Sequence, residues 1–449
     1  MKYLKSQKTL LLEENKLNCK LKIYEYELAL NSLGIYRGIL KDGVIKNLYS
    51  LVSSLKKNEN DINEIISEYY NFYFELMENG NGKSLRSYIA EKIIYSNNAF
   101  AKVCQNFGFE QLSEEIKSSA ANDLKNLQFI STFTSAHIIK YLEGCTDFEK
   151  VYTLPVWQDE PGSEDEAFDI LLSSPNWEDS IYDLWNFHNK MGTGLFSRFK
   201  GFVWEGDTLQ GVVSLDPIRL DQLVNYERQK GIVVNNTKAF LKGKKANNIL
   251  LYGSRGTGKS STVKALLNEF YSEGLRVIEI PKQYLITFPK LIRILKNSPL
   301  KFILFIDDLA FEDSEETYTA LKAILEGGLE NKPDNVIIYA TSNRRHIVKE
   351  KFSDRENLGG SYSDDDIHAA DSLEEKLSLS DRFGITVTYI HPNQREYIAI
   401  VKTLATQRGI EIPEEELERR ALQWAMSYNG RSPRTARQFI DSLEGESVR

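Results

Sequence analysis

The chain has 449 residues, of which 41% are hydrophobic and 27% are charged, and these values are ordinary for a protein with several folded cores. Its formal net charge is −8, from 56 basic and 64 acidic residues. This balance argues against a general nucleic-acid coat, because phosphate binding needs many cations. No apolar run approaches the roughly 20 residues that span a bilayer, so we expect no membrane partner. The three cysteines are scattered, which fits reduced thiols and a cytoplasmic protein.

Residues 1–180 are predicted to form a mostly helical region that binds a partner. Apolar side chains recur at helical spacing over residues 62–76. A group of aromatic residues in this segment is either a partner-binding stripe or core packing, and we favour the core; the group is Tyr69, Tyr70, Phe72, Tyr73 and Phe74. Residues 181–214 are expected to connect this region to the next one, and residues 199–211 within them are typical of a strand, a turn and a second strand.

An α/β pattern starts near residue 215 and contains a phosphate-binding loop. A strand is predicted at 248–252 and a helix at 261–271. Between them lies G-x-x-x-x-G-K-[ST], whose glycines let backbone N–H groups surround a phosphate at the positive end of a helix. The expected nucleotide-binding residues are Gly253, Ser254, Arg255, Gly256, Thr257, Gly258, Lys259, Ser260 and Ser261. We expect Lys259 to reach the β- and γ-phosphates of ATP, and the Ser260 hydroxyl to bind Mg²⁺.

Two further predicted strands end in polar residues. The apolar run 301–306 is followed by Asp307 and Asp308, and the strand at 335–341 is followed by Asn343. The carboxyl ends of strands in α/β sheets face the ligand crevice. We therefore expect Asp307 to complete the Mg²⁺ shell and Asp308 to orient or deprotonate the attacking water. Asn343 is a candidate to reach the γ-phosphate or the same water.

The phosphate-binding loop and the polar strand ends follow one another as the motifs of the AAA+ ATPases do. The resemblance to this superfamily covers about residues 215–449. Residues 253–260 are similar to the Walker A loop, residues 302–308 to the Walker B strand, and Asn343 falls at sensor 1. Residues 221–229 resemble the segment that lies beside the adenine. The resemblance implies an α/β fold with a three-layer αβα P-loop NTPase core.

We expect the AAA+ core to occupy residues 215–391 and a small helical lid to occupy residues 392–449. Asn393 is a suitable N-cap for the first lid helix, and Pro433 suits the first turn of the last one. The predicted lid helices are 394–407, 414–428 and one that starts at Ser432.

Two arginines in AAA+-like segments are candidate catalytic residues. Arg382, within 380–384, resembles the arginine finger, which would act on the γ-phosphate bound by a neighbouring subunit and implies a homo-oligomer, either a ring or a partial ring. Arg434 resembles sensor 2 and would contact the γ-phosphate of its own subunit, with Arg431 as its competitor. Either candidate could instead be a surface ion-pair residue. The polar insert 353–372 is interpreted as a moving interface loop or as disorder.

Some features depart from the commonest AAA+ pattern. Asp308 stands where many members have glutamate, and this variant looks like bacterial replication initiators, helicase loaders and transposition helpers. No aromatic–apolar–glycine pore loop lies between the Walker motifs. The segments around Trp185, at 192–196, at 216–221 and at 375–384 resemble more specifically a bacterial AAA+ family of unknown function.

The sequence therefore predicts a cytoplasmic, Mg²⁺-dependent ATP hydrolase. It would remodel or load an unidentified protein partner that the N-terminal region selects. One alternative is an ATP-gated scaffold with little turnover. Another is a DNA-associated loader, although the net charge does not support nucleic-acid binding.

Overall fold

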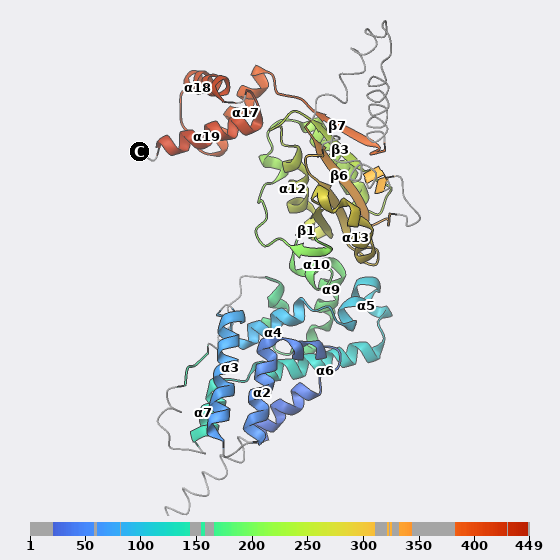
Figure 1. The fold of residues 1–449 in the computed structure, drawn as a ribbon, viewed down its shortest axis with the longest axis vertical. Helices are drawn as coiled ribbons and strands as arrows, with labels where there is room; N and C mark the ends of the chain where they lie inside the picture. The colour runs from blue at the N-terminus through green and yellow to red at the C-terminus, as the bar shows by residue number, and fades with distance from the viewer. Residues whose placement is uncertain are drawn as a thin grey trace, which may run out of the picture. The chain divides into compact units, whose positions relative to one another are not determined.

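The chain forms two compact units, Met1–Ser197 and Arg198–Arg449 (Figure 1). The computed structural model describes residues 21–57, 61–80, 82–143, 154–157, 166–309, 321–322, 324–325, 332–343, 382–428 and 430–447. Within these ranges, every helix is too short or too polar to cross a lipid bilayer.

The first unit is built of helices, most of which contribute apolar side chains to one core, and the last of them, α10, crosses into the second unit. They are residues 21–31, α2 (Gly43–Lys57), α3 (Ile62–Gly80), α4 (Leu85–Ile94), α5 (Ala99–Asn106), α6 (Glu114–Ser131), α7 (Ser135–Glu143), α8 (Asp169–Leu172), α9 (Ile181–Met191) and α10 (Leu195–Arg198). The helical period of α3 divides the aromatic group between two faces. Tyr69 and Phe72 are fully buried, whereas Tyr70 and Phe74 are 47% and 62% exposed. Tyr69 and Phe72 are therefore core residues, as we favoured, whereas Tyr70 and Phe74 lie at the surface.

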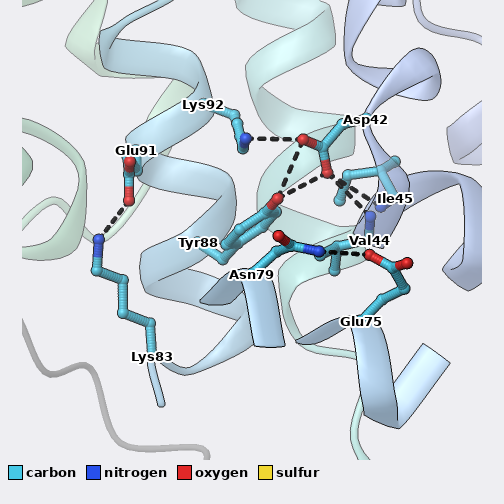
Figure 2. A network of polar contacts seen from close by, with 9 residues as sticks. All are labelled: Asp42, Val44, Ile45, Glu75, Asn79, Lys83, Tyr88, Glu91 and Lys92. Carbon is cyan, nitrogen blue, oxygen red and sulfur yellow. Dashed lines mark hydrogen bonds and ion pairs between the residues drawn. The ribbon is translucent and has the colours of Figure 1, made fainter. Parts of the chain in front are cut away.

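A polar network joins α2 to α4 inside this unit (Figure 2). The Asp42 carboxylate accepts the backbone N–H of Val44 in the first turn of α2, at 3.1 Å. It also accepts the Tyr88 hydroxyl at 2.8 Å and forms an ion pair with Lys92 at 2.7 Å, both from α4. The Asp42 side chain is 18% exposed, so its charge is largely removed from water and is compensated by these donors. One carboxylate thus fixes the beginning of α2 against α4.

The second unit is built on a seven-stranded sheet in the order β2-β1-β4-β5-β6-β3-β7. All neighbouring strands are parallel except β1 and β2, which form an antiparallel hairpin at the edge. The strands are β1 (Gly201–Glu205), β2 (Thr208–Gly211), β3 (Ile249–Gly253), β4 (Leu275–Glu279), β5 (Lys301–Ile306), β6 (Val336–Ser342) and β7 (Ile385–Tyr389). Strands β3, β5 and β6 carry the predicted polar ends, and the sheet places β3 and β5 on either side of β6.

Helices cover both faces of this sheet, which gives the expected three-layer αβα core. The chain crosses from β3 to β4 in one direction along the sheet and from β4 back to β5 in the other. Right-handed crossovers therefore place α12 (Lys259–Phe270) and α13 (Phe288–Leu295) on opposite faces (Figure 1). Helix α11 (Glu227–Leu241) packs with α12 over the odd-numbered residues of the strands, such as Leu251 and Ile303.

The chain ends in three helices with their own apolar core: α17 (Gln394–Gln407), α18 (Glu414–Ser427) and α19 (Pro433–Ser447). Asn393 is the N-cap of α17 and forms a capping box with Glu396. Ser432 accepts the backbone N–H of Thr435 at 3.1 Å and thereby stabilises the start of α19. These helices match the predicted lid helices closely, because caps and prolines are local signals.

Candidate nucleotide-binding site

The loop between β3 and α12 has the backbone shape that a phosphate requires. Gly253 has φ +131°, and a Cβ there would lie 1.9 Å from the carbonyl oxygen of Tyr389 on β7, so only glycine fits. The N–H of Ser254 donates to that same oxygen at 2.8 Å, which fastens the loop to β7. Helix α12 begins at Lys259, two residues before the predicted start, and its free N–H groups face the loop.

Lys259 lies at the centre of the loop and is almost completely buried, at 5% exposure. Its Nζ donates to the carbonyl oxygens of Gly253 and Ser254 at 3.0 and 2.7 Å, and to Asn343 Oδ1 at 2.8 Å. Burial lowers the pKa of Lys259 to about 8, with Asp307 and Asp308 acting in the opposite direction. The ammonium is therefore aimed into the site by neutral acceptors.

The Asp307 carboxylate joins the loop to the ends of two strands. Its Oδ1 accepts the Ser260 hydroxyl at 2.6 Å and the Thr341 hydroxyl from β6, also at 2.6 Å. A carboxylate beside a hydroxyl is an oxygen donor set that Mg²⁺ prefers. The two residues expected to bind the metal are thus in direct contact. Thr341, which the sequence reading missed, orients the carboxylate.

Asp308 is held in an uncommon backbone conformation. Its φ is +52°, in the left-handed region, which turns the chain away from β5 as the strand ends. The backbone N–H of Asp308 donates to the Thr341 hydroxyl at 2.9 Å, and its Oδ1 accepts from Asn343 Nδ2 at 2.5 Å. Such conformations persist where neighbours enforce them, and they cluster at functional sites. The turn brings both aspartates to the same edge as the loop.

The C-terminal helices close one side of the site. The backbone N–H of Arg434 donates to the carbonyl oxygen of Gly256 at 3.2 Å. A Cβ at Gly256, where φ is +75°, would lie 3.0 Å from Ser432 Oγ and 3.2 Å from Arg434 Cβ. The glycine loop and the start of α19 therefore meet closely. Together they enclose a cavity of about 570 Å³ that reaches from the loop to Asp307, Asp308 and Asn343.

Three residues that the sequence reading missed also line this cavity: Arg437, Gln438 and Asp441. They follow Arg434 at helical spacing on α19, so the i, i+3, i+4, i+7 pattern was the signal that could have found them. Arg437 also lines a second hollow, whose walls come from residues 222–226, Tyr389 and α17. Arg437 therefore lines both hollows, one of which is walled by part of the segment 221–229 that the resemblance places beside the adenine.

A family model described as "Protein of unknown function (DUF815)" matches residues 197–447, more than half of the chain. The chain belongs to this family. In this DUF815 protein, the loop, the polar strand ends, the sheet order and the C-terminal helices form an AAA+ ATPase fold, as the sequence predicted.

The chain is also similar, over smaller parts of its length, to more distant proteins. The replication factor C large subunit of Aeropyrum pernix is 39% identical over 71 residues, which are 15% of this chain and 14% of that protein. RuvB of Thermotoga maritima matches at 17% identity with a TM-score of 0.34, over 50% of this chain and 64% of that one. AMPPCP-bound DnaA from Aquifex aeolicus matches at 21% identity with a TM-score of 0.35, over 51% of this chain and 66% of that one. The chain thus spans less than two thirds of each of these proteins.

The candidate arginines differ in their position relative to the cavity. Arg434 lines the cavity, while Arg431 and Arg382 are not among the described residues that line it. The carbonyl oxygen of Arg431 instead contacts His391 Nδ1 at 3.1 Å, and Arg382 lies just before β7. Arg434 is therefore better placed than Arg431 for the sensor 2 role. Residues 380 and 381 of the finger segment and the 353–372 insert lie outside the described residues.

We expect ATP affinity to decrease as the pH rises through about 8. The free protein has Lys259 with a pKa of about 8, and bound phosphates would raise it, so binding above that pH takes up a proton. Below about pH 7, Lys259 is protonated in both the free and the ATP-bound protein, so it contributes no pH dependence to ATP affinity. The limiting slope is about tenfold in Kd per pH unit.

Calorimetry with a non-hydrolysable ATP analogue, in two buffers of different ionisation enthalpy, measures this proton uptake. The Lys259→Arg variant is the matched control, because arginine does not titrate in this range. Equal proton uptake by both proteins, or no uptake by the wild type at about pH 9, would show that Lys259 is not the group that takes up a proton when ATP binds.

Proposed function

We propose that this protein is a cytoplasmic AAA+ ATPase that hydrolyses Mg²⁺-ATP at the interfaces of a homo-oligomer. The energy would be used to remodel or load a protein partner that the N-terminal helical unit selects. The observation that carries the proposal is one continuous chain of hydrogen bonds. It runs from Lys259 through Asn343 to Asp308, and from there through Thr341 and Asp307 to Ser260.

This chain of contacts supports the proposal, because Lys259, Asn343, Asp308, Asp307 and Ser260 all line one cavity. Lys259 offers a cation to phosphate oxygens, and the free N–H groups at the start of α12 offer further donors. Asp308 and Asn343 lie together where a water could be oriented for in-line attack. The lid adds Arg434 and Arg437, which supports a site that responds to the number of phosphates present.

The residues present also fit a magnesium ion. Ser260 and Asp307 would hold it, since they are a hydroxyl and a carboxylate in contact at the cavity wall. When bound, Mg²⁺ would neutralise charge on the β- and γ-phosphates. Among the described residues, no cluster of histidine, cysteine and acidic side chains offers a competing metal site.

The Lys259→Ala variant tests the proposed function. It removes the buried cation aimed at the phosphates, and hydrogen bonds to charged groups contribute about 1.5–3 kcal/mol each, so we expect affinity for a fluorescent ATP analogue to fall about a hundredfold. Steady-state phosphate release should fall with it. The exposed Lys264→Ala change on α12 is the matched control and should leave both measurements unchanged.

Two outcomes would reject the proposal or change it. Tight binding of the analogue by Lys259→Ala would remove the loop from nucleotide binding. Tight binding by the wild type without phosphate release would favour a nucleotide-gated scaffold instead of a hydrolase.

A further inference from the structure

Three aromatic side chains of the first unit form a partly exposed cluster that the nucleotide site does not use. We call it the aromatic surface; its rings are those of Phe109, Tyr182 and Trp185, and Phe107 adjoins it through the hydrogen bond from Trp185. Phe107 and Tyr182 are 50% and 55% exposed, and the other two are partly exposed. The Phe109 ring lies 5.2 Å from that of Tyr182 and 5.8 Å from that of Trp185, and the last two rings are 5.4 Å apart. Apolar side chains gathered at the surface and rimmed by polar residues are candidates for an interaction site.

The surrounding fold holds the aromatic surface in place. Trp185 Nε1 donates to the carbonyl oxygen of Phe107 at 3.0 Å, which ties α9 to the residue that ends α5. Ile181 and Leu184, on the other side of α9, are buried in the core of the unit. The rings are therefore positioned before any partner arrives, so binding would cost little additional ordering entropy.

Exposed acidic residues adjoin the residues of the aromatic surface in the chain. Glu110 follows Phe109 in the short 3-10 helix η2 (Phe109–Gln111), and Asp183 follows Tyr182 in the first turn of α9. Asp179 lies in the turn just before that helix, and all three acids are exposed. Within the described part of the chain, Glu110 and Asp183 form no ion pair. The surface therefore offers uncompensated negative charge beside aromatic rings.

One cation already occupies part of this surface. Lys117 Nζ lies 4.7 Å from the centroid of the Phe109 ring and pairs with Glu114 at 2.9 Å. A ring face attracts a cation, and a neighbouring carboxylate adds an ion pair. The exposed ring of Tyr182 and the partly exposed ring of Trp185, with the exposed Asp183 between them in the chain, offer ring faces and a carboxylate to a cation from elsewhere.

We propose that the aromatic surface binds a basic segment of a partner polypeptide. An arginine guanidinium would stack on Tyr182 and Trp185 and pair with Asp183, because its planar group stacks on rings and bonds carboxylates at once. Tyrosine, tryptophan and arginine dominate the strongest positions of protein interfaces. The acidic rim repels phosphate, which disfavours a nucleic acid here. The inference rests on the proposed function, for which it names the class of partner.

The test uses the full chain without nucleotide and a fluorescein-labelled (Arg-Gly-Ser)4 peptide, with (Glu-Gly-Ser)4 as the charge control. Fluorescence anisotropy should show binding of the arginine peptide alone. Tyr182→Ala and Asp183→Lys should each weaken it about tenfold, as expected for loss of a cation–π contact or reversal of an adjacent charge. Matched controls on α3 are Tyr70→Ala, from a tyrosine of similar exposure, and Glu64→Lys, and both should bind like the wild type.

The proposal is overturned if the arginine peptide binds no better than the glutamate peptide, or if Tyr182→Ala and Asp183→Lys bind it as tightly as the controls do. The proposal would also be overturned if the wild type binds a single-stranded oligonucleotide and Tyr182→Ala abolishes that binding. It would likewise be overturned if the variants lose self-association but keep their affinity for the arginine peptide. Phosphate release by these variants should equal that of the wild type. Because the peptide assay contains no nucleotide, failure of the ATPase assignment and failure of this surface are separate results.

Discussion

Replacing Arg382 with alanine should leave ATP binding intact and slow hydrolysis by about 10³–10⁵-fold, the effect of an arginine finger in other phosphoryl-transfer enzymes. Within the described residues, Arg382 does not line its own subunit's cavity, which is compatible with action on the site of a neighbour. A fixed, forked cation stabilises charge that develops on the transferred phosphoryl group, so the loss should affect turnover and not affinity. Analogue binding and phosphate release measure the two effects.

Mixing two inactive variants provides the sharpest form of this experiment. Arg382→Ala retains a sound nucleotide pocket, and Lys259→Ala retains a sound finger. Mixed oligomers should therefore contain some competent interfaces and recover part of the turnover. Wild-type activity should also rise more than linearly with protein concentration while the oligomer assembles.

The exposed Arg395, in the first turn of α17, is the matched control for Arg382. Arg395→Ala should hydrolyse ATP like the wild type. Full activity of a monomer in sedimentation experiments would leave Arg382 as a structural residue. Absence of recovery in oligomers shown to be mixed would lead to the same conclusion.

Asp308→Asn should retain ATP binding and lose turnover by about 10²–10⁴-fold, the usual contribution of a positioned general base. The asparagine keeps an oxygen that can accept from Asn343 Nδ2, so the local structure should persist. It cannot take a proton from the attacking water. The measurements are analogue affinity and single-turnover phosphate release.

Asp307→Ala should behave differently, although the two residues are adjacent. It removes the acceptor of both the Ser260 and Thr341 hydroxyls and the carboxylate expected to bind Mg²⁺. Affinity for Mg²⁺-ATP should therefore fall, and added Mg²⁺ should partly restore it. Asp334→Asn, an exposed change before β6, is the control for both aspartates. Turnover by Asp308→Asn near the wild-type rate would assign the base role to another group.

The local elements of the second unit could be predicted from the sequence, because their signals lie within a few residues. The glycines of 253–258 allow backbone angles that other residues avoid, and apolar runs mark the strands around them. Asn393 and Glu396 form a capping box, a contact between residues three apart. The AAA+ fold followed from these patterns and their order, and the same patterns predict that the loop binds nucleotide.

The tertiary structure decided which side chains meet, because those contacts join residues far apart in the chain. Thr341 contacts Asp307 only because β6 lies beside β5, and the left-handed turn at Asp308 depends on that hydroxyl. Arg434 and Arg437 reach the cavity only because α19 begins against Gly256. In the first unit, helical period predicted an apolar face in α3. The packing of other helices determined that Tyr69 is buried and Tyr70 is not, since burial depends on what covers a face as well as on which face a residue occupies.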